Sequence, residues 1–297
     1  MQATLVSQVF LPLALFIIML SVGMSLTIKD FQRVAAHPRA ILLGVVTQLI
    51  CLPLLGWVVV QLFGLPVLLA AGLMILTLAP GGATSNAITL LSRGDTALSV
   101  SLTAVNSLIV PFTLPLLALL VFQGLSMGPM SIEFPVFQAI QQMLLITLLP
   151  VCVGMLLGHF FPVINARLQK TCRSLALILM LMTVVLLVVT SWERLVLLLP
   201  QLALPVLTLV LAAMGLGYLA ARFFGLPEPQ RITLLVEVGL QNAGTALLVT
   251  STLLKSPEMS ASALVYGVLM QVPALLLIGW RNRQIFSQHW QREETVS

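Results

Sequence analysis

Long apolar runs, each followed by a short polar connection, recur along the whole chain. A helix that crosses a bilayer needs about 20 consecutive apolar residues, and runs of this length continue to residue 280. The pattern predicts nine transmembrane helices, at about 5–26, 40–62, 67–91, 97–122, 135–160, 174–191, 196–221, 232–254 and 261–280. The fold class expected from this pattern is an all-α polytopic membrane protein.

The connections are short and rich in Gly, Pro and charge, as in Phe63-Gly64-Leu65-Pro66 and Phe224-Gly225-Leu226-Pro227. We therefore expect one transmembrane domain over residues 1–297, with residues 281–297 as a tail after the last helix. Composition agrees, because 59% of the residues are hydrophobic and 8% are charged. Soluble domains contain about 25% charged residues, so this chain does not have the composition of a soluble protein.

Basic residues gather on alternate connections. If the N-terminus lies outside, twelve of the fourteen Lys and Arg residues lie on the inner side, and Arg194 and Lys255 lie on the outer side. The inner set is Lys29, Arg33, Arg39, Arg93, Arg167, Lys170, Arg173, Arg222, Arg231, Arg281, Arg283 and Arg292. Cytoplasmic connections are enriched in Lys and Arg, so this split predicts a cytoplasmic C-terminus in the inner (plasma) membrane. It also accounts for the net charge of +5 without a nucleic-acid partner.

Residues that could indicate an enzyme or a metal centre form no recognised motif in the sequence. Cys51, Cys152 and Cys172 lack metal-type spacing and are too few for a disulfide framework. The sequence contains no nucleophile elbow, HExxH or phosphate loop, so an enzyme is not expected. The apolar N-terminus lacks a basic start and a cleavage pattern, so we expect the first helix to be retained.

The third apolar segment is interrupted by Pro80-Gly81-Gly82. Proline removes a backbone donor and clashes with the preceding turn, and glycine adds backbone freedom. Irregular backbone at membrane depth is tolerated only where it lines a cavity or is buried in protein. The sequence indicates a broken helix, with Thr84, Ser85 and Asn86 placed to cap its second half; a merely kinked helix remains the alternative. The positive end of that half-helix would favour an anionic group.

The eighth segment, Arg231 to Leu254, is long enough to span a membrane but carries a carboxylate. Glu237 is followed by Gly239, Gln241 and Asn242. A carboxylate at the centre of a bilayer costs about 2.5 to 3.5 kcal/mol on insertion scales, so a cation, a proton or a water-filled cavity should compensate for it. The glycine and the amides suggest a second interrupted helix whose exposed carbonyls could bind a cation.

The two interrupted segments occupy matching positions in two halves of the chain. Each is the penultimate segment of its half: the first repeat, residues 1–122, has four segments and the second, residues 135–280, has five. Paired interruptions of this kind point to a transporter site built from repeats. Because the halves enter the membrane from opposite sides, the repeats (4+5) are expected to be inverted, with one helix missing from the first.

Polar residues elsewhere in the spans are less specific. Gln48 lies in the middle of the second segment, where a buried amide usually bonds to a neighbouring helix. Ser99, Thr103 and Asn106 have i, i+4 and i+7 spacing and share one helix face. Hydroxyl groups on such a face commonly bond to their own helix, so these four residues alone do not define a site.

Two motifs together resemble the bile acid:sodium symporter family. They are APGGATSNAITLLSRGDTALSVSLT and EVGLQNAGTAL, and the LSVGMSLTIKDF and HPRAILLGVVTQ stretches also fit, so the similarity runs from about residue 13 to 280. The resemblance implies a panel domain and a core domain, with two discontinuous helices that cross near the midplane. It also implies two co-transported sodium ions. One site would use Ser85, Asn86, Ser99, Thr103 and Glu237. The other would use Gln48, Gln241 and Glu237 with backbone carbonyls near Val238 and Leu240.

The expected function is a sodium-coupled symporter that imports a small organic anion by alternating access. The anion could be bile acid-like or a small carboxylate such as pantothenate or pyruvate, with Thr84 and Asn242 as substrate-binding residues. The alternatives left open are proton coupling through Glu237, an efflux carrier of the same superfamily, and, from another class, a membrane sensor or intramembrane enzyme. The lipid bilayer is the expected surrounding. The oligomeric state stays open, with a monomer as the simplest case.

Overall fold

The computed structural model describes residues 6–36, 38–125, 134–190 and 192–294. These residues form helices joined by short connections, and their only β-type pairing is an isolated bridge between Gly81 and Gln241. In the first half the helices are η1 (Val6–Phe10), α2 (Leu11–Ser25), α3 (Ile28–Ala36), α4 (Pro38–Val46), η2 (Thr47–Cys51), α5 (Leu52–Phe63), α6 (Val67–Thr77), α7 (Ala83–Leu91) and α8 (Thr96–Leu125). In the second half they are α9 (Val136–Met143), η3 (Leu144–Leu148), α10 (Leu149–Phe160), α11 (Pro162–Thr190), α12 (Trp192–Phe223), α13 (Glu228–Gly239), α14 (Ala243–Leu247), η4 (Leu248–Leu253), α15 (Pro257–Leu269) and α16 (Gln271–Glu294).

Six helical stretches of the described residues are long and apolar enough to cross a membrane, which makes the chain a multi-pass membrane protein. They are Gln8–Ser25, Pro38–Phe63, Thr96–Leu125, Val136–Phe160, Leu195–Phe223 and Pro257–Arg283. Val67–Thr77 and Ala243–Leu253 are shorter apolar helices. Each lies inside a segment that the sequence predicts to be interrupted. The count of nine crossings stays a prediction.

Two predicted boundaries differ from the structure. The sixth segment was expected to begin at residue 174, but α11 begins at Pro162, so Arg167 and Lys170 lie on a helix instead of in a loop. Proline at the first position of a helix is already set to the helical φ angle, and polarity alone does not end a helix. Likewise, α16 continues to Glu294, into the predicted tail. The predicted link between the repeats, near residues 124–133, falls mostly outside the described residues.

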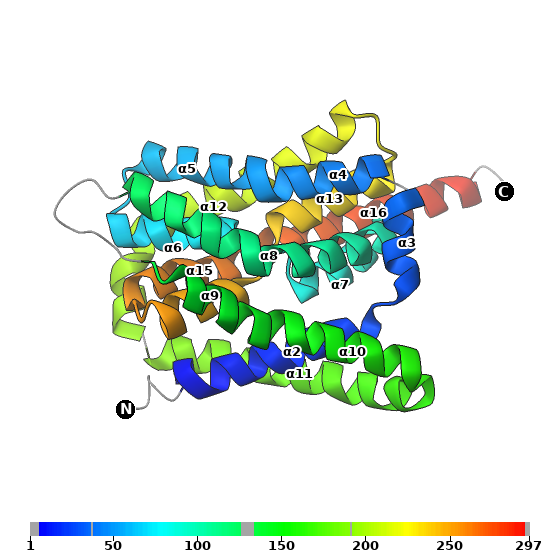
Figure 1. Ribbon diagram of the computed structural model, residues 1–297. Helices are drawn as coiled ribbons and strands as arrows, with labels where there is room; N and C mark the ends of the chain where they lie inside the picture. The colour runs from blue at the N-terminus through cyan, green and yellow to red at the C-terminus, as the bar shows by residue number, and fades with distance from the viewer. Residues whose placement is uncertain (1–5, 37, 126–133, 191, 295–297) are drawn as a thin grey trace.

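The helices pack in two groups (Figure 1). In one group α2 packs against α10 and α11, and these three helices form the lower layer in Figure 1. Gly23 allows this contact, because a Cβ there would lie 2.2 Å from the carbonyl oxygen of Val151. In the other group α12 packs against α13, α15 and α5, and α6 packs against α15. The largest buried hydrophobic cluster, which includes Leu73, Ile75 and Tyr266, lies mainly in this second group.

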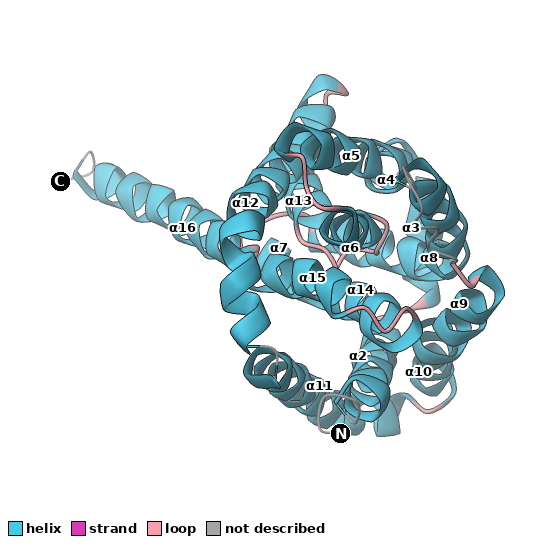
Figure 2. Cartoon of the chain, turned by 90° about the vertical axis from the view of Figure 1, so that its left-hand side faces the viewer, coloured by secondary structure: helices cyan, strands magenta, loops and turns pink. Residues whose placement is uncertain are grey.

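The third and eighth apolar segments are both interrupted, as predicted. Helix α6 ends at Thr77 and α7 begins at Ala83, whereas α13 ends at Gly239 and α14 begins at Ala243. Figure 2 shows loop segments in the interior of the bundle, beside α6, α7 and α13. Buried backbone groups must find hydrogen-bond partners. The partners of the freed amides and carbonyls therefore determine which ligands this region can bind.

Candidate functional site

The two interruptions satisfy each other's backbone groups. The amide of Gly82 donates to the carbonyl of Leu240 at 3.2 Å, and the amide of Asn242 donates to the carbonyl of Pro80 at 2.9 Å. These two bonds form the antiparallel bridge in which Gly81 pairs with Gln241. The unwound residues of both segments are therefore held against one another in the protein interior, where irregular backbone is tolerated.

Glu237 lies in the last turn of α13, beside this bridge, and its side chain is buried. Its Oε1 accepts hydrogen bonds from Ser85 Oγ of α7 at 2.7 Å and from Ser99 Oγ of α8. One carboxylate oxygen thus joins three helices. No Lys or Arg side chain in the described part of the chain forms an ion pair with Glu237, so no cation among these residues compensates its charge.

The second carboxylate oxygen of Glu237 faces the backbone of the other interruption. Glu237 Oε2 is buried and has no hydrogen-bond partner among the residues that the structure describes. A Cβ on Gly81 would lie 2.5 Å from this oxygen, a distance that real Cβ atoms do not reach. Glycine at position 81 therefore gives the carboxylate its room. A buried and unpartnered charged oxygen is unfavourable unless something else binds it.

Asn86 and Thr103 extend the cluster around Ser99. Asn86 Oδ1 accepts from Ser99 Oγ at 2.7 Å and from Thr103 Oγ1 at 3.5 Å. Ser85 Oγ likewise has two acceptors in range, Glu237 Oε1 and the Gly82 carbonyl at 2.7 Å. Each hydroxyl has a single proton to donate. More acceptor oxygens than donor protons therefore converge here, an arrangement that favours a bound cation.

The predicted helix face on α8 is confirmed, since Ser99, Thr103 and Asn106 are all buried. Asn106 Oδ1 has no hydrogen-bond partner in the described residues. Asn106 forms no hydrogen bond to the Glu237 cluster among the residues that the structure describes. The resemblance did not place it in either sodium site, and the structure gives no reason to add it.

Gln48 and Gln241 form a second cluster on the other side of the bridge. Gln48 Nε2 donates to Gln241 Oε1 at 2.6 Å and to the Ala79 carbonyl at 3.0 Å, while Gln241 Nε2 donates to the Val238 carbonyl at 2.7 Å. Gln48 lies in η2, a π-helical turn of the kind often found at functional sites. A half-turn of either amide exchanges its oxygen and nitrogen, so the same side chains can present oxygens to an ion.

Both clusters offer oxygen ligands of the kinds that hard cations prefer, namely hydroxyl, amide, carboxylate and carbonyl groups. The part of the chain that the structure describes contains no group of three or more His, Cys, Asp or Glu side chains that could hold a metal ion. Glu237 and Gln241 are four residues apart on the same segment, so the two clusters are neighbours. Val238 and Leu240 lie between these two residues in the chain, and hydrogen bonds link the other predicted cation ligands to Glu237 or Gln241, directly or through Ser99 and Asn86.

Thr84 and Asn242, the predicted substrate residues, line one cavity. It lies between α2 and the bridge and is open on one side. Apart from Thr84, Asn242 and Gln241, its lining residues are apolar or glycine. They are Leu11, Ala14, Leu15, Ile18, Gly82, Ala243, Gly244, Leu247, Leu264, Gly267, Val268 and Met270. An apolar cavity with a few polar groups at one end is the usual form of a small-molecule site.

The predicted capping of α7 is wrong. Thr84, Ser85 and Asn86 were expected to cap this half-helix, but it begins at Ala83 with Gly82 at the cap position and no side-chain cap. The extended backbone of Gly82 lets the helix begin at once, so these side chains already lie within it. At the second interruption Asn242 does cap α14, since its Oδ1 accepts from the Thr245 amide at 3.1 Å.

Tyr266 is a residue of this region that the sequence did not single out. Its side chain on α15 is fully buried, and its hydroxyl donates to the carbonyl of Gly239 at 2.9 Å. That carbonyl is one of the last of α13 and has no partner within its own helix. The available signal was a tyrosine within an apolar span, because a buried phenol needs a hydrogen-bond partner.

Comparison with known proteins gives a consistent picture. Residues 12–198 match the model of the sodium bile acid symporter family. An uncharacterized sodium-dependent transporter of Bacillus subtilis is 28% identical over 96% of this chain and 84% of its own length. A probable sodium/metabolite cotransporter of Oryza sativa chloroplasts is 29% identical over 90% of this chain and 62% of its own length. The human ileal sodium/bile acid cotransporter is 27% identical over 93% of this chain and 80% of its own length.

Proposed function

Because the chain belongs to the sodium bile acid symporter family, we propose that it is a sodium-coupled secondary transporter that imports an organic anion by alternating access. The observation that carries the proposal is Glu237, a buried carboxylate that pairs with no Lys or Arg of the described residues and has one oxygen without a partner among them. A bound sodium ion would neutralise this charge. The names of the relatives from Bacillus subtilis, rice and human all include sodium.

Two sodium ions bind at the bridge in this proposal. The first is held by Ser85, Asn86, Ser99, Thr103 and Glu237. The second is held by the side chains of Gln48 and Gln241, by Glu237, and by the carbonyls of Val238 and Leu240. Carbonyls at the ends of interrupted helices are a recurrent source of ligands for coupling ions in transporters. Glu237 belongs to both sites and couples them.

The stoichiometry has a thermodynamic reason. At about 100 mV each sodium ion supplies ~2.3 kcal/mol, and a tenfold gradient adds ~1.4 kcal/mol. Two ions supply about 7.4 kcal/mol, of which the entry of a monovalent anion against the potential uses ~2.3. The remaining ~5 kcal/mol would concentrate substrate by about three and a half orders of magnitude, whereas one ion would allow only ~tenfold accumulation.

The two helix groups correspond to the two moving parts of this mechanism. We assign α2, α10 and α11 to the panel and the remaining long helices, with both interrupted segments, to the core. The repeats are residues 1–122 and 135–280, in nine crossings with an outside N-terminus and a cytoplasmic C-terminus. The cavity lies where α2 meets the bridge, so sliding of one group past the other would change its access.

The substrate in this proposal is a moderately hydrophobic organic anion. The cavity is mostly apolar, with the polar groups of Thr84 and Asn242 at the bridge. The N-terminus of α7 begins beside Gly82, and helix N-termini favour anionic groups. The apolar body of the anion would pack against α2, and its carboxylate would approach Thr84 and Asn242.

Proton coupling is the second candidate, because the unpartnered Oε2 of Glu237 could bind a proton instead of a sodium ion. The test uses the full chain in proteoliposomes, supplied with a panel of organic acids that stabilise the purified protein. We expect uptake to require an inward sodium gradient, to fail in potassium, and to persist when the pH gradient is collapsed. Uptake that follows the pH gradient in the absence of sodium would replace this proposal with proton coupling.

A further inference from the structure

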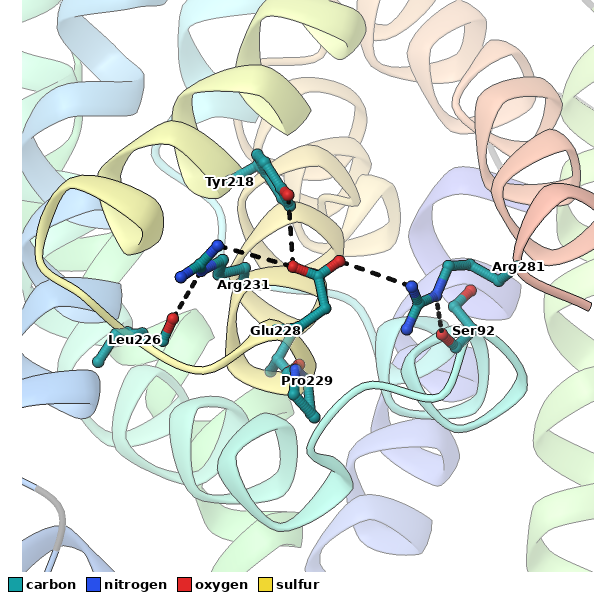
Figure 3. Close-up of polar contacts among 8 residues, drawn as sticks. Ser92, Tyr218, Leu226, Glu228, Pro229, Arg231 and Arg281 are labelled. Atoms are coloured by element: carbon teal, nitrogen blue, oxygen red, sulfur yellow. Dashed lines mark hydrogen bonds and ion pairs between the residues drawn. The ribbon is translucent and has the colours of Figure 1, made fainter. Parts of the chain in front are cut away.

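Arg281 joins two half-helices, α7 and α13, at the ends that lie farthest from the bridge (Figure 3). These ends are called the outer ends below, and the half-helices carry the first cation cluster. Its Nε donates to the carbonyl of Ser92 at 3.2 Å, and its Nη1 lies 3.5 Å from Glu228 Oε1. Ser92 is the C-cap of α7 and Glu228 is the first residue of α13. One guanidinium group on α16 therefore contacts both half-helices at once.

Glu228 is the centre of this contact. Its Oε2 accepts from the Tyr218 hydroxyl at 3.3 Å and lies 3.9 Å from Nη1 of Arg231. Arg231 in turn donates through Nε to the Leu226 carbonyl at 2.6 Å. The network links α12, α13, α16 and the end of α7, and Figure 3 shows the side chains converging on the Glu228 carboxylate.

The charges of Arg281 and Glu228 suit the helix ends that these side chains contact. The C-terminus of α7 carries partial negative charge and receives the arginine, while the N-terminus of α13 carries partial positive charge and begins with the glutamate. The Arg281 side chain is 17% exposed and that of Glu228 is 42% exposed. A pair this exposed contributes little to stability by its Coulomb attraction, so its importance lies in what it positions.

Helices α7 and α13 run side by side in opposite directions, with contacts at both ends. At the outer end the Asp95 amide, just after α7, donates to the Pro229 carbonyl at 3.1 Å, next to the Arg281 contact. At the inner end the Gly82 amide bonds to the Leu240 carbonyl. The Ser85–Glu237 hydrogen bond lies between these two attachments. The separation of the cation ligands therefore depends on how both ends are held.

We propose that Arg281 is a positioning residue for the first cation cluster: by holding the outer ends of α7 and α13 together, it sets the distance between Ser85 and Glu237. This inference rests on the proposed function, since it assumes that the cluster binds sodium. Ligand groups must stay within about 0.5 Å of the productive geometry. Loss of the Arg281 contact weakens the outer attachment, lets the half-helices shift apart and weakens sodium binding, although Arg281 itself does not contact the ion.

The test measures sodium binding without a substrate. Purified full-length protein is titrated with NaCl that replaces KCl at constant total salt, which keeps the screening of ion pairs constant. The unfolding temperature follows sodium binding, because a ligand of the folded state raises apparent stability. For Arg281→Gln we expect the half-saturating sodium concentration to rise about fivefold.

Three further variants define what the effect means. Glu228→Gln should give a similar shift, and the double variant should give less than the sum of the two, because the residues act through one contact. Arg281→Lys should restore only part of the affinity, since an ammonium group is a single point charge that does not reproduce the guanidinium fork. Arg283→Gln is the matched control, because Arg283 is exposed on the same helix, and it should leave the titration unchanged.

The outcomes separate this inference from the proposed function. If the wild-type protein shows no sodium-specific stabilisation, both are wrong. If the wild type responds and Arg281→Gln has a wild-type half-saturating concentration, only the role of Arg281 is wrong. A variant that is less stable in KCl but keeps its sodium affinity would make Arg281 a purely structural residue and would likewise overturn the inference.

Discussion

The interruption at Pro80 to Gly82 carries no charge, whereas the one at Leu240 to Asn242 comes one turn after the buried carboxylate of Glu237. The first is opened by its own residues, since proline and two glycines cannot continue a helix easily. The second contains no proline. Its freed groups are satisfied by the first interruption, by the Asn242 cap and by Tyr266.

This difference shows a division of roles between the two halves of the chain. The first half contributes neutral hydroxyl and amide oxygens and, at Gly81, the space into which the carboxylate fits. The second half contributes the charge and the side-chain cap. Neither half alone contains a complete oxygen cluster, so variants at corresponding positions of the two interruptions should have unequal effects.

The largest effect should come from removing the charge. Glu237→Ala leaves the hydroxyls of Ser85 and Ser99 without their shared acceptor, and it removes the only group proposed for both sodium sites. We expect sodium-dependent uptake to fall to background while the protein still inserts into the membrane. Glu193→Ala, at an exposed position, is the control and should transport normally. Wild-type transport by Glu237→Ala would overturn the mechanism.

Gln241→Ala should be equally severe for sodium-dependent uptake. It removes the partner of Gln48 and the donor to the Val238 carbonyl in one change, so we expect sodium-dependent uptake to be abolished here too. Gln48→Ala leaves the bond between Gln241 and Val238 in place and should retain part of the activity. Initial rates of uptake measured against sodium concentration would show this order. Equal loss of uptake in Gln241→Ala and Gln48→Ala would contradict it.

Gly81→Ala tests the space that the first interruption leaves for the Glu237 carboxylate. The new methyl group would meet Glu237 Oε2 at 2.5 Å, whereas the same change at Gly82 meets the Gln241 carbonyl at 3.3 Å. We expect the half-saturating sodium concentration to rise about tenfold for Gly81→Ala and about threefold for Gly82→Ala, within the usual range of coupling between contacting residues. Gly279→Ala, where nothing lies within 4 Å of the added carbon, should match wild type in the sodium titration.

The smallest expected effects concern stability and come from the N-terminal caps, because α14 has a side-chain cap and α7 has none. Asn242→Ala removes the cap of α14 and should lower the free energy of unfolding by about 1 kcal/mol, whereas Asn242→Ser keeps a capping oxygen and should not. Thr84→Ala should leave stability unchanged, because α7 has no side-chain cap. Thermal unfolding in potassium salts measures these differences. If Asn242→Ser keeps its stability but loses substrate binding, the amide itself contacts the substrate.

The sequence was most informative where a single local property decided the structure. Pro80 with two glycines predicted one interruption, and the charge of Glu237 marked the other before any contact was known. The pairing of Gly81 with Gln241, the Tyr266 bond and the start of α7 at Ala83 were not predicted. Each depends on partners or backbone angles that local pattern does not encode. The sharing of oxygens among α7, α8 and α13 was implied only by the family resemblance.

The backbone bridge also has a consequence for biosynthesis. Ser85 and Glu237 are 152 positions apart, so the first interruption is made long before its partner. At about 5 to 20 residues per second, the Pro80 carbonyl and the Gly82 amide wait ~8 to 30 seconds for the groups that satisfy them. Unsatisfied backbone in lipid is strongly unfavourable. The nascent first half of the chain must therefore keep this segment in contact with water or the insertion machinery until residues 240–242 have been made.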